Sequence, residues 1–362
     1  MKYEPYRGGN THNTLPDSGN YYLANDILRN TNGGTVIVKS GTTHRLCLNG
    51  HTITHRNPAG RLYDIRGTFY LEDCSAYTDS EDHYISGGIT YDAADSTMAY
   101  GNAILIQRGG TMTMTEGQIH GFHSSLAANQ NSVPVYLHGA NTTAKAVFNM
   151  QGGQIHSNTS KSNGAAIMLS KASSNAATAN FSEVNISGGK IWGNTSAGKG
   201  GAIAMTSNQL TITGGTITGN TAATGAVYAG SEVKLIISGN PVISDNTGGN
   251  LYLADNVTIQ LGDMKTGAKI GVDAAKVSRA ISNTQETDPT AAFTSDNDQY
   301  TVSFKNSCLY LGSAHEHGIQ GGQGDLGWTA WNSETSLPLT SGNYYLEKNV
   351  QLAQELTLPE NV

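Results

Sequence analysis

The chain has 362 residues, of which 14% are charged, and its formal net charge at pH 7 is −7. A nucleic-acid-binding protein needs a basic stripe, so this balance argues against nucleic acid as a partner. No apolar run is long enough to cross a bilayer, and no basic-then-apolar leader follows Met1. We therefore expect no membrane insertion in this segment.

A long repeat sets the expected boundaries. The phrase Ser18-Gly-Asn-Tyr-Tyr-Leu returns at Ser341, 341 − 18 = 323 residues later, and Leu-Pro precedes both copies. The Gly-rich polar stretch over 315–325 reads as a linker. We predict an N-terminal lead-in over 1–14, a folded unit over 15–312, and over 313–362 a linker with the start of a second, truncated unit. Tandem units of the same chain are thus expected partners.

The three cysteines, Cys47, Cys74 and Cys308, lie far apart, and the chain has no Cys-x-x-Cys motif. This spacing indicates neither a zinc site nor a disulfide framework. Strand-type residues flank Cys47 and Cys74 in what we expect to be neighbouring coils. We therefore predict that the cysteines are buried free thiols.

Four tyrosines interrupt the sequence between Cys74 and Gly101, namely Tyr77, Tyr84, Tyr91 and Tyr100. We expect this insertion to project from the regular part of the fold. Because binding residues concentrate on loops that a rigid scaffold holds in place, the insertion is a candidate contact surface.

A turn-flanked phrase recurs along the middle of the chain, as Met114-Thr-Glu-Gly-Gln-Ile-His, Met150-Gln-Gly-Gly-Gln-Ile-His, Ile186-Ser-Gly-Gly-Lys-Ile-Trp and Ile212-Thr-Gly-Gly-Thr-Ile-Thr. Its isoleucine stays in register at 119, 155, 191 and 217, with steps of 36, 36 and 26 residues. A period of 20 to 50 residues is typical of a solenoid. An apolar segment that opens on small residues, such as Gly164-Ala-Ala-Ile, follows each copy.

Periodicity predicts which solenoid this is. Residues between the glycines alternate apolar and polar, as half-buried strands do, and no segment carries a helical stripe. We predict an all-β right-handed parallel β-helix with three short strands per coil. Ile119, Ile155, Ile191 and Ile217 should be buried in one stack, and Met150, Ile186 and Ile212 in another, while Thr, Ser and Asn form ladders outside.

Asparagine recurs at the predicted corners, at Asn158, Asn194, Asn220 and Asn246, and threonine follows each one. Asn tolerates the left-handed backbone conformation, and its side chain can bond the backbone of a turn. We therefore assign these residues a structural role. Asn158 and Asn194 also complete glycosylation sequons, which a repeat generates by itself.

One outward column stands out, because the residues after the register isoleucine are His120, His156 and Trp192, followed by Thr218. In adjacent coils they would stack about 4.8 Å apart on one sheet face. Such rings suit contact with a sugar or with an apolar patch of another protein. Two alternatives stay open: a metal held by the paired imidazoles, or tolerated variation on a Thr-rich face.

Several phrases together resemble the large repeat-containing surface proteins of gut-dwelling Gram-positive bacteria, which are similar in shape to the pectate-lyase-like superfamily. They are Leu46-Cys-Leu-Asn-Gly-His-Thr-Ile, Leu71-Glu-Asp-Cys-Ser, Phe293-Thr-Ser-Asp-Asn-Asp-Gln-Tyr and the Gly-Gly-x-Ile-x-x-Asn-Thr coils. The Gly-Gly-Ala-Ile phrases are also loosely similar to chlamydial outer-membrane passengers. The resemblance implies secretion, attachment to the cell wall at the bacterial cell surface, and adhesion or scaffolding.

An enzyme of the pectate-lyase kind is the alternative function. Arg56-Asn-Pro-Ala-Gly-Arg61 matches the lyase pattern Arg-x-Pro-x-x-Arg, in which the first arginine acts as the base. Carboxylates over the following segment, at Asp73, Asp79, Glu81 and Asp82, could offer oxygen ligands to Ca²⁺. The competing interpretation is an exposed turn with solvated arginines, followed by a solvated acidic loop.

Glycoside hydrolysis is disfavoured, because it needs two carboxylates that flank the scissile bond and the chain has no adjacent Asp pair. We therefore expect a non-catalytic bacterial cell-surface module without a cofactor, an adhesin or stalk. Its expected partner is a host or microbial glycan or a surface protein.

Overall fold

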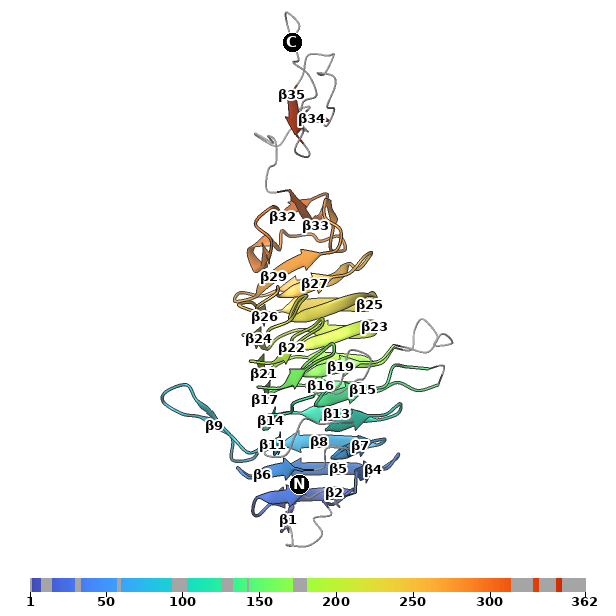
Figure 1. Cartoon of the computed structure of the whole chain (residues 1–362), viewed down its shortest axis with the longest axis vertical. Helices are drawn as coiled ribbons and strands as arrows, with labels where there is room; N and C mark the ends of the chain where they lie inside the picture. The colour runs from blue at the N-terminus through green and yellow to red at the C-terminus, as the bar shows by residue number, and fades with distance from the viewer. Residues whose placement is uncertain are drawn as a thin grey trace, which may run out of the picture. The chain divides into compact units, whose positions relative to one another are not determined.

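The computed structural model describes residues 2–7, 15–29, 34–56, 60–92, 103–124, 133–141, 143–171, 181–313, 328–331 and 343–346. The chain divides into two compact units, Met1–Gly312 and Ser313–Val362. Nearly all the regular secondary structure in the described part of the first unit is strand, and most of the strands belong to one 26-stranded sheet. Figure 1 shows these strands stacked along the unit from β1 to β29.

The pairings of this sheet fall into three columns of parallel strands, and each coil of the chain passes through all three. Column A contains β2 (Gly19–Leu23), β5 (Thr43–Cys47), β8 (Thr68–Glu72), β13 (Thr111–Met114), β16 (Val147–Met150), β20 (Glu183–Ile186), the second parts of β23 (Ile203–Ile212) and β25 (Val227–Gly239), and β28 (Ile259–Met264).

Column B contains β3 (Ile27–Arg29), β6 (Thr52–His55), β11 (Gly88–Tyr91), β14 (Gln118–His120), β17 (Gln154–His156), β21 (Lys190–Trp192), β24 (Thr216–Thr218), β26 (Val242–Ile243), the first part of β29 (Lys269–Ala274), and β31 (Phe293–Ser295). Column C contains β4 (Val36–Val38), β7 (Tyr63–Ile65), β12 (Ile104–Ile106), β15 (Val135–Leu137), β19 (Ile167–Leu169), the first parts of β23 and β25, β27 (Leu251–Leu253), and the end of β29.

Shorter elements complete the unit. β9 (Tyr77–Thr78) and β10 (Tyr84–Ile85) form an antiparallel hairpin, and β18 (Thr159–Ser160) pairs with β22 (Thr195–Ser196). A separate small sheet contains β30 (Arg279–Ala280), β32 (Tyr300–Lys305) and β33 (Cys308–Ser313), next to the 3-10 helix η2 (Thr290–Ala292).

The hydrophobic core forms the predicted stacks. Ile119, Ile155, Ile191 and Ile217 pair in register in column B, and each is at most 1% exposed. The same stack extends in both directions, through Ile27, Ile53 and Ile89 on one side and Ile243, Ile270 and Phe293 on the other. Met150, Ile186 and Ile212 pair in column A and are also buried. The core predictions are therefore confirmed.

The corner asparagines differ from the prediction, because they line the interior instead of the surface. Asn158, Asn194 and Asn220 are fully buried, and none of them has a positive φ. The Asn194 Nδ2 donates to Asn220 Oδ1 at 2.9 Å and to the backbone carbonyl of Ile155 at 3.0 Å. Asn158 donates to Asn194 in the same way. Burial of these polar side chains is tolerated because each amide forms hydrogen bonds to groups in the next coil and in the preceding coil.

The prediction of free thiols is wrong for two cysteines, because Cys47 and Cys74 form a disulfide. β5 pairs with β8 in register, with Cys47 opposite Glu72, so Cys74 lies just beyond the end of the neighbouring strand. The separation of 27 residues is close to one coil. Cys308 is free and half-buried.

The N-terminal segment is also more than a lead-in, because β1 (Glu4–Tyr6) pairs with β2 in parallel. The second unit contains a similar pair, in which β34 (Trp328–Trp331) runs parallel to β35 (Asn343–Leu346). β35 has the same sequence, Asn-Tyr-Tyr-Leu, as residues 20–23 of β2. In the described residues of both units, no helix is long and apolar enough to span a bilayer.

Candidate functional site

The candidate site is the row of outward-facing rings on column B. The structure brings its predicted members, His120, His156 and Trp192, together on neighbouring strands. Strand alternation turns the residue after each buried isoleucine outward. The pairing of β14 with β17 and of β17 with β21 then places His120 beside His156 and His156 beside Trp192. We call these three residues the aromatic column.

The rings of the aromatic column stack face to face. The ring centroids of His120 and His156 are 4.9 Å apart with an interplanar angle of 3°, and those of His156 and Trp192 are 4.6 Å apart at 13°. The Lys190 ammonium lies 5.4 Å from the centre of the Trp192 ring. Both faces of His156 are therefore covered by its neighbours.

Glutamine side chains fix the ring orientations. The Gln118 Oε1 accepts from His156 Nε2 at 2.7 Å, and the Gln154 Oε1 accepts from Trp192 Nε1 at 2.8 Å. A ring nitrogen that faces a carbonyl oxygen has to carry its proton, so His156 is protonated at Nε2. His156 Nδ1 then accepts from the Ser157 hydroxyl at 3.0 Å.

Burial lowers the pKa of both imidazoles. Desolvation lowers the pKa of His120 from its usual value. Desolvation also lowers the pKa of His156 to about 4, and the charges of His120 and Lys190 add to the effect. The nitrogen lone pairs lie in the ring planes, and stacked parallel rings do not direct them at one point. In the described part of the chain, no cluster of three or more His, Cys, Asp or Glu side chains could hold a metal ion.

The stacking changes how the column can meet a ligand. A sugar cannot lie against His156, because both faces of that ring are occupied. The outer face of Trp192 is different, since Thr218 follows it in the next coil and adds no ring to the stack, and the Lys190 ammonium lies over the indole. The column thus offers the end of an aromatic stack, with the Lys190 ammonium over its last ring, and a row of ring edges.

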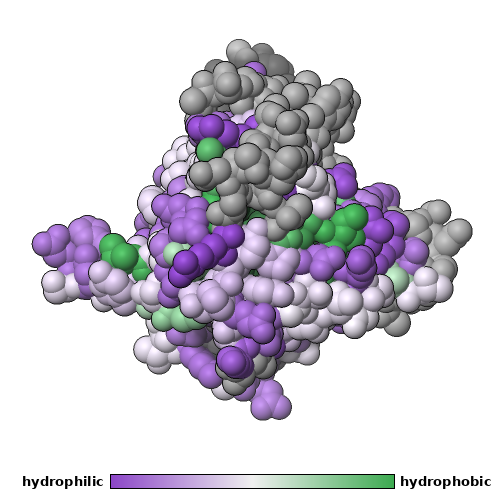
Figure 2. All heavy atoms as spheres, turned by 90° about the horizontal axis from the view of Figure 1, so that it is seen from below, coloured by the Kyte–Doolittle hydropathy of each residue, from purple (hydrophilic) through white to green (hydrophobic). Residues whose placement is uncertain are grey.

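The tyrosine insertion separates into residues with different roles. Tyr77 and Ile85 are cross-strand neighbours on the β9–β10 hairpin, and they are 57% and 42% exposed. The hairpin projects from the stack (Figure 1), and hydrophobic surface is visible on it beside a hydrophilic tip (Figure 2). This exposed pair is a second candidate contact surface.

Two of the other tyrosines, Tyr84 and Tyr91, are not free for binding. Tyr84 donates to Glu116 Oε2 at 2.5 Å and accepts from the Gly117 backbone N–H at 3.1 Å, so it anchors the hairpin to the next coil. Tyr91 is only 5% exposed and lies in the core beside Phe122, which contradicts the predicted surface role. Tyr100 lies outside the described residues.

Arg56, Asp73 and Asp79 of the lyase alternative are engaged in other contacts. Arg56 forms an ion pair with Asp92 at 2.5 Å, and half-buried Arg61 lies just before β7. Asp73 is buried, and its Oδ1 accepts from Gly50 N–H and from the backbone and hydroxyl of Ser75. A carboxylate held by these donors closes a turn.

The acidic loop is the tip of the hairpin. The Asp79 carboxylate accepts from the backbone N–H groups of Glu81 and His83 and pairs with the His83 ring. Asp82 has a positive φ of 65° in the same turn. The predicted Ca²⁺ ligands Asp73, Asp79 and Asp82 thus serve turn geometry.

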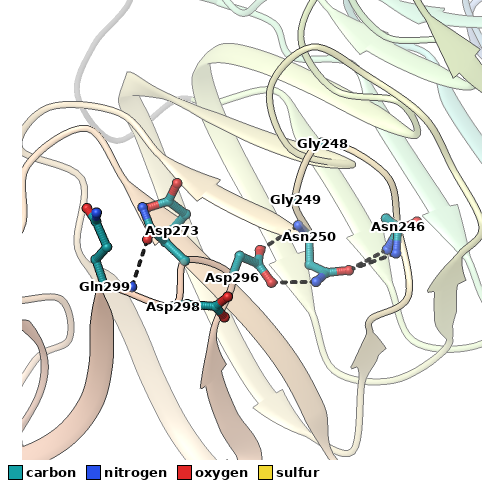
Figure 3. Close-up of a pocket in the computed structure, with 9 residues that line it drawn as sticks. Asn246, Gly248, Gly249, Asn250, Asp273, Asp296, Asp298 and Gln299 are labelled. Carbon is teal, nitrogen blue, oxygen red and sulfur yellow. Dashed lines mark hydrogen bonds between the residues drawn. The ribbon is translucent and has the colours of Figure 1, made fainter. Parts of the chain in front are cut away.

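The corner asparagines Asn158, Asn194, Asn220 and Asn246 form, together with Asn250, a hydrogen-bonded row, the asparagine ladder. Sequence reasoning missed an open pocket at the far end of this ladder, lined by Asn246, Gly248, Gly249, Asn250, Asp273, Asp296, Asn297, Asp298 and Gln299 (Figure 3). Asn246 Nδ2 donates to Asn250 Oδ1 at 2.8 Å. The Asn250 backbone N–H and Nδ2 both donate to the Asp296 carboxylate, at 2.6 and 2.5 Å.

Burial raises the pKa of Asp296, against the opposing effect of its two bonds from Asn250. The Asp296 carboxylate accepts from the last amide of the ladder, Asn250, and so forms the end of the ladder at one wall of the pocket. The run Asp296-Asn-Asp-Gln was visible in the sequence, but it carries no repeat signal that places it beside Asn250.

Comparison of the chain with protein-family models, with curated proteins and with solved structures finds no match in any of the three. The structure supports the all-β, solenoid-like part of the resemblance to bacterial surface proteins.

Proposed function

We propose that the first unit is a right-handed parallel β-helix module of a secreted bacterial surface protein, which binds glycan on an outer face and is not an enzyme. The aromatic column carries this proposal. An indole fixed by stacking, with a lysine ammonium over the ring and amide side chains beside it, has the composition that suits a sugar ring.

The column is also prepared for binding before a ligand arrives. Stacking on His156 and the hydrogen bond to Gln154 hold Trp192 in one orientation. A ring that is already fixed loses little conformational entropy on binding, so more of the contact energy becomes affinity. A face built on paired strands is also more rigid than a loop.

The Cys47–Cys74 disulfide agrees with a location outside the cytoplasm. Disulfides persist in oxidising compartments and are rare in reducing ones. The phrase that begins at Ser18 and returns at Ser341 supports a chain of several such units, in which each unit would add a copy of the binding face. A pure stalk without a ligand is the main competing role within this class.

A glycan array with the whole chain tests the proposal. We expect binding to at least one oligosaccharide, and we expect Trp192→Ala to weaken it about tenfold or more, the loss of about 1.4 kcal/mol of contact energy. Thr211→Ala is the matched control, since Thr211 also faces outward but lies on column A, away from the aromatic column.

The control should bind like the unaltered chain, and both variants should keep the same melting temperature. If no glycan binds, the stalk role is favoured. If binding is unchanged in Trp192→Ala, the aromatic column is not the site.

A further inference from the structure

A second stacked aromatic pair lies on the outer face of column C. Tyr228 on β25 pairs with Tyr252 on β27, and their ring centroids are 5.8 Å apart with an interplanar angle of 11°. The Lys199 ammonium lies 4.5 Å from the centre of the Tyr228 ring and donates to its hydroxyl at 3.1 Å. Lysine therefore engages Tyr228 and leaves Tyr252 as the outer ring of the pair.

The pocket begins one strand beyond this pair. Tyr252 pairs with Asp273 on β29, and Asp273 is part of the pocket lining. Neighbouring strands are about 4.8 Å apart, so the outer face of Tyr252 adjoins the pocket mouth. Tyr252 is half-buried, and the short Asp273 side chain cannot cover a phenol ring. An aromatic face and a concave polar surface are thus continuous.

The pocket wall exposes backbone where the chain passes between Asn246 and Asn250. Gly248 has a φ of +85°, and a Cβ there would lie 1.9 Å from the Ala222 carbonyl oxygen. Only glycine fits this position, so no side chain fills the wall at that point.

The lining is rich in hydrogen-bond acceptors and contains no lysine, arginine or histidine. Asp296 is committed to Asn250, whereas Asp298 is exposed, and Figure 3 shows it beside Asp296 at the pocket. Exposed carboxylate and amide groups accept from hydroxyl donors, and the absence of a lining cation disfavours an acidic ligand.

We propose that Tyr252 and this pocket form a separate binding subsite for a neutral sugar, with one ring against Tyr252 and hydroxyl groups on Asp273, Asp298 and Gln299. The proposal rests on the proposed function as a glycan-binding module. It adds a second face, on a different column from Trp192, and specifies the charge of the ligand. Uronates and sialylated sugars are excluded, because their carboxylates would meet the aspartates of the lining.

The test uses the whole chain and an array that carries neutral oligosaccharides beside uronate-containing and sialylated ones. For a neutral oligosaccharide bound at this subsite, we expect Tyr252→Ala and Asp298→Ala each to weaken binding about tenfold or more, and Tyr252→Phe to retain it. Trp192→Ala, which alters the other face, should leave this binding unchanged. Melting temperatures of all variants establish that they are folded.

Three outcomes overturn the subsite. In the first, neutral-glycan binding depends on Trp192 and is unaffected by Tyr252→Ala and Asp298→Ala, which leaves the proposed function intact. In the second, the glycans that depend on Tyr252 are acidic. In the third, no glycan binds at all, and this result also removes the proposed function.

Discussion

Buried asparagines give the interior of this protein a polar line among stacked aliphatic side chains. Asn194 illustrates the arrangement, because its Oδ1 accepts from both the backbone N–H and the Nδ2 of Asn158, at 3.2 and 2.8 Å. Its own Nδ2 donates to two backbone carbonyl groups and to Asn220. Removing one amide therefore leaves donors and acceptors unsatisfied in three coils.

We predict that Asn194→Ala lowers the free energy of unfolding by about 3 kcal/mol or more, because each buried polar group left unsatisfied costs about 1–3 kcal/mol. Urea denaturation measures the change. Asn185→Ala is the control, since Asn185 is half-buried on the outer side of β20 and its amide donates to Asn149. Its loss should cost about 0.5 kcal/mol or less. Equal effects of the two substitutions would contradict the buried ladder.

His156 offers a test of the aromatic column by pH. We predict an imidazole pKa of about 4 in the folded chain, against the ordinary 6.5 that applies when the chain is unfolded. Between these values the unfolded chain binds more protons, so the free energy of unfolding falls as the pH drops from 6.5 toward 4. Above pH 6.5 the stabilisation is complete.

An NMR titration of the imidazole carbon-bound protons gives the pKa directly. Substituting His156→Gln should remove its share of the acid destabilisation. A folded-state pKa near the ordinary value would mean that the stack between His120 and Trp192 opens in solution.

Among the elements, β5 and β8 are joined twice, by their register and by the Cys47–Cys74 disulfide. Cys74 lies three residues before Tyr77, where the hairpin that carries Tyr77 and Ile85 begins. The covalent link therefore fixes the base of the projecting hairpin to the stack. The chain-entropy model relates such a link to the length of the loop that it closes.

We predict that removing the disulfide in Cys47→Ala/Cys74→Ala lowers the free energy of unfolding by about 3 kcal/mol, given the separation of 27 residues. Urea unfolding with and without a reductant measures the effect. Cys308→Ser is the control and should not change the response to reductant, since Cys308 is free. A reductant that leaves the stability of the unaltered chain unchanged would show that the thiols are not linked.

Strand positions were predictable because alternation and the repeat are local signals. The isoleucine register needs only the spacing of one phrase, and all the predicted isoleucines pair as expected. The location of the corner asparagines was not predictable in this way. Turn propensity favours an exposed Asn, and only the meeting of successive coils supplies the partners that allow its burial.

The same limit applies to the site. Sequence spacing predicted that His120, His156 and Trp192 adjoin, but it could not show that the rings cover one another. Tyr91 looked like a member of an insertion, whereas it continues the buried face of β11. The pocket joins Asn250 to Asp296 across 46 residues that contain no repeat phrase. No local pattern could have linked them.

For the whole molecule, the large sheet contains no described strand beyond β31, and β34 pairs only with β35 in its own unit. We predict that a chain shortened to residues 1–313, which keeps all of β33, loses less than about 1 kcal/mol of stability, because repeat units bury their faces against neighbours within the stack. Thermal melting decides this prediction. A broad transition, or a large fall in melting temperature, would show that residues 314–362 complete the first core.

The asparagine ladder has a direction along the stack. Each side-chain amide from Asn194 to Asn250 accepts from the asparagine before it in the row and donates to the next residue of the row, so the side-chain dipoles align and reinforce one another. The donor end of such a row carries partial positive charge, and the anionic Asp296 lies at that end, as an anion does at the first turn of a helix. The two ends of the row are therefore chemically unlike. An inner coil can be copied without altering this polarity, whereas the last coil needs a residue that only accepts.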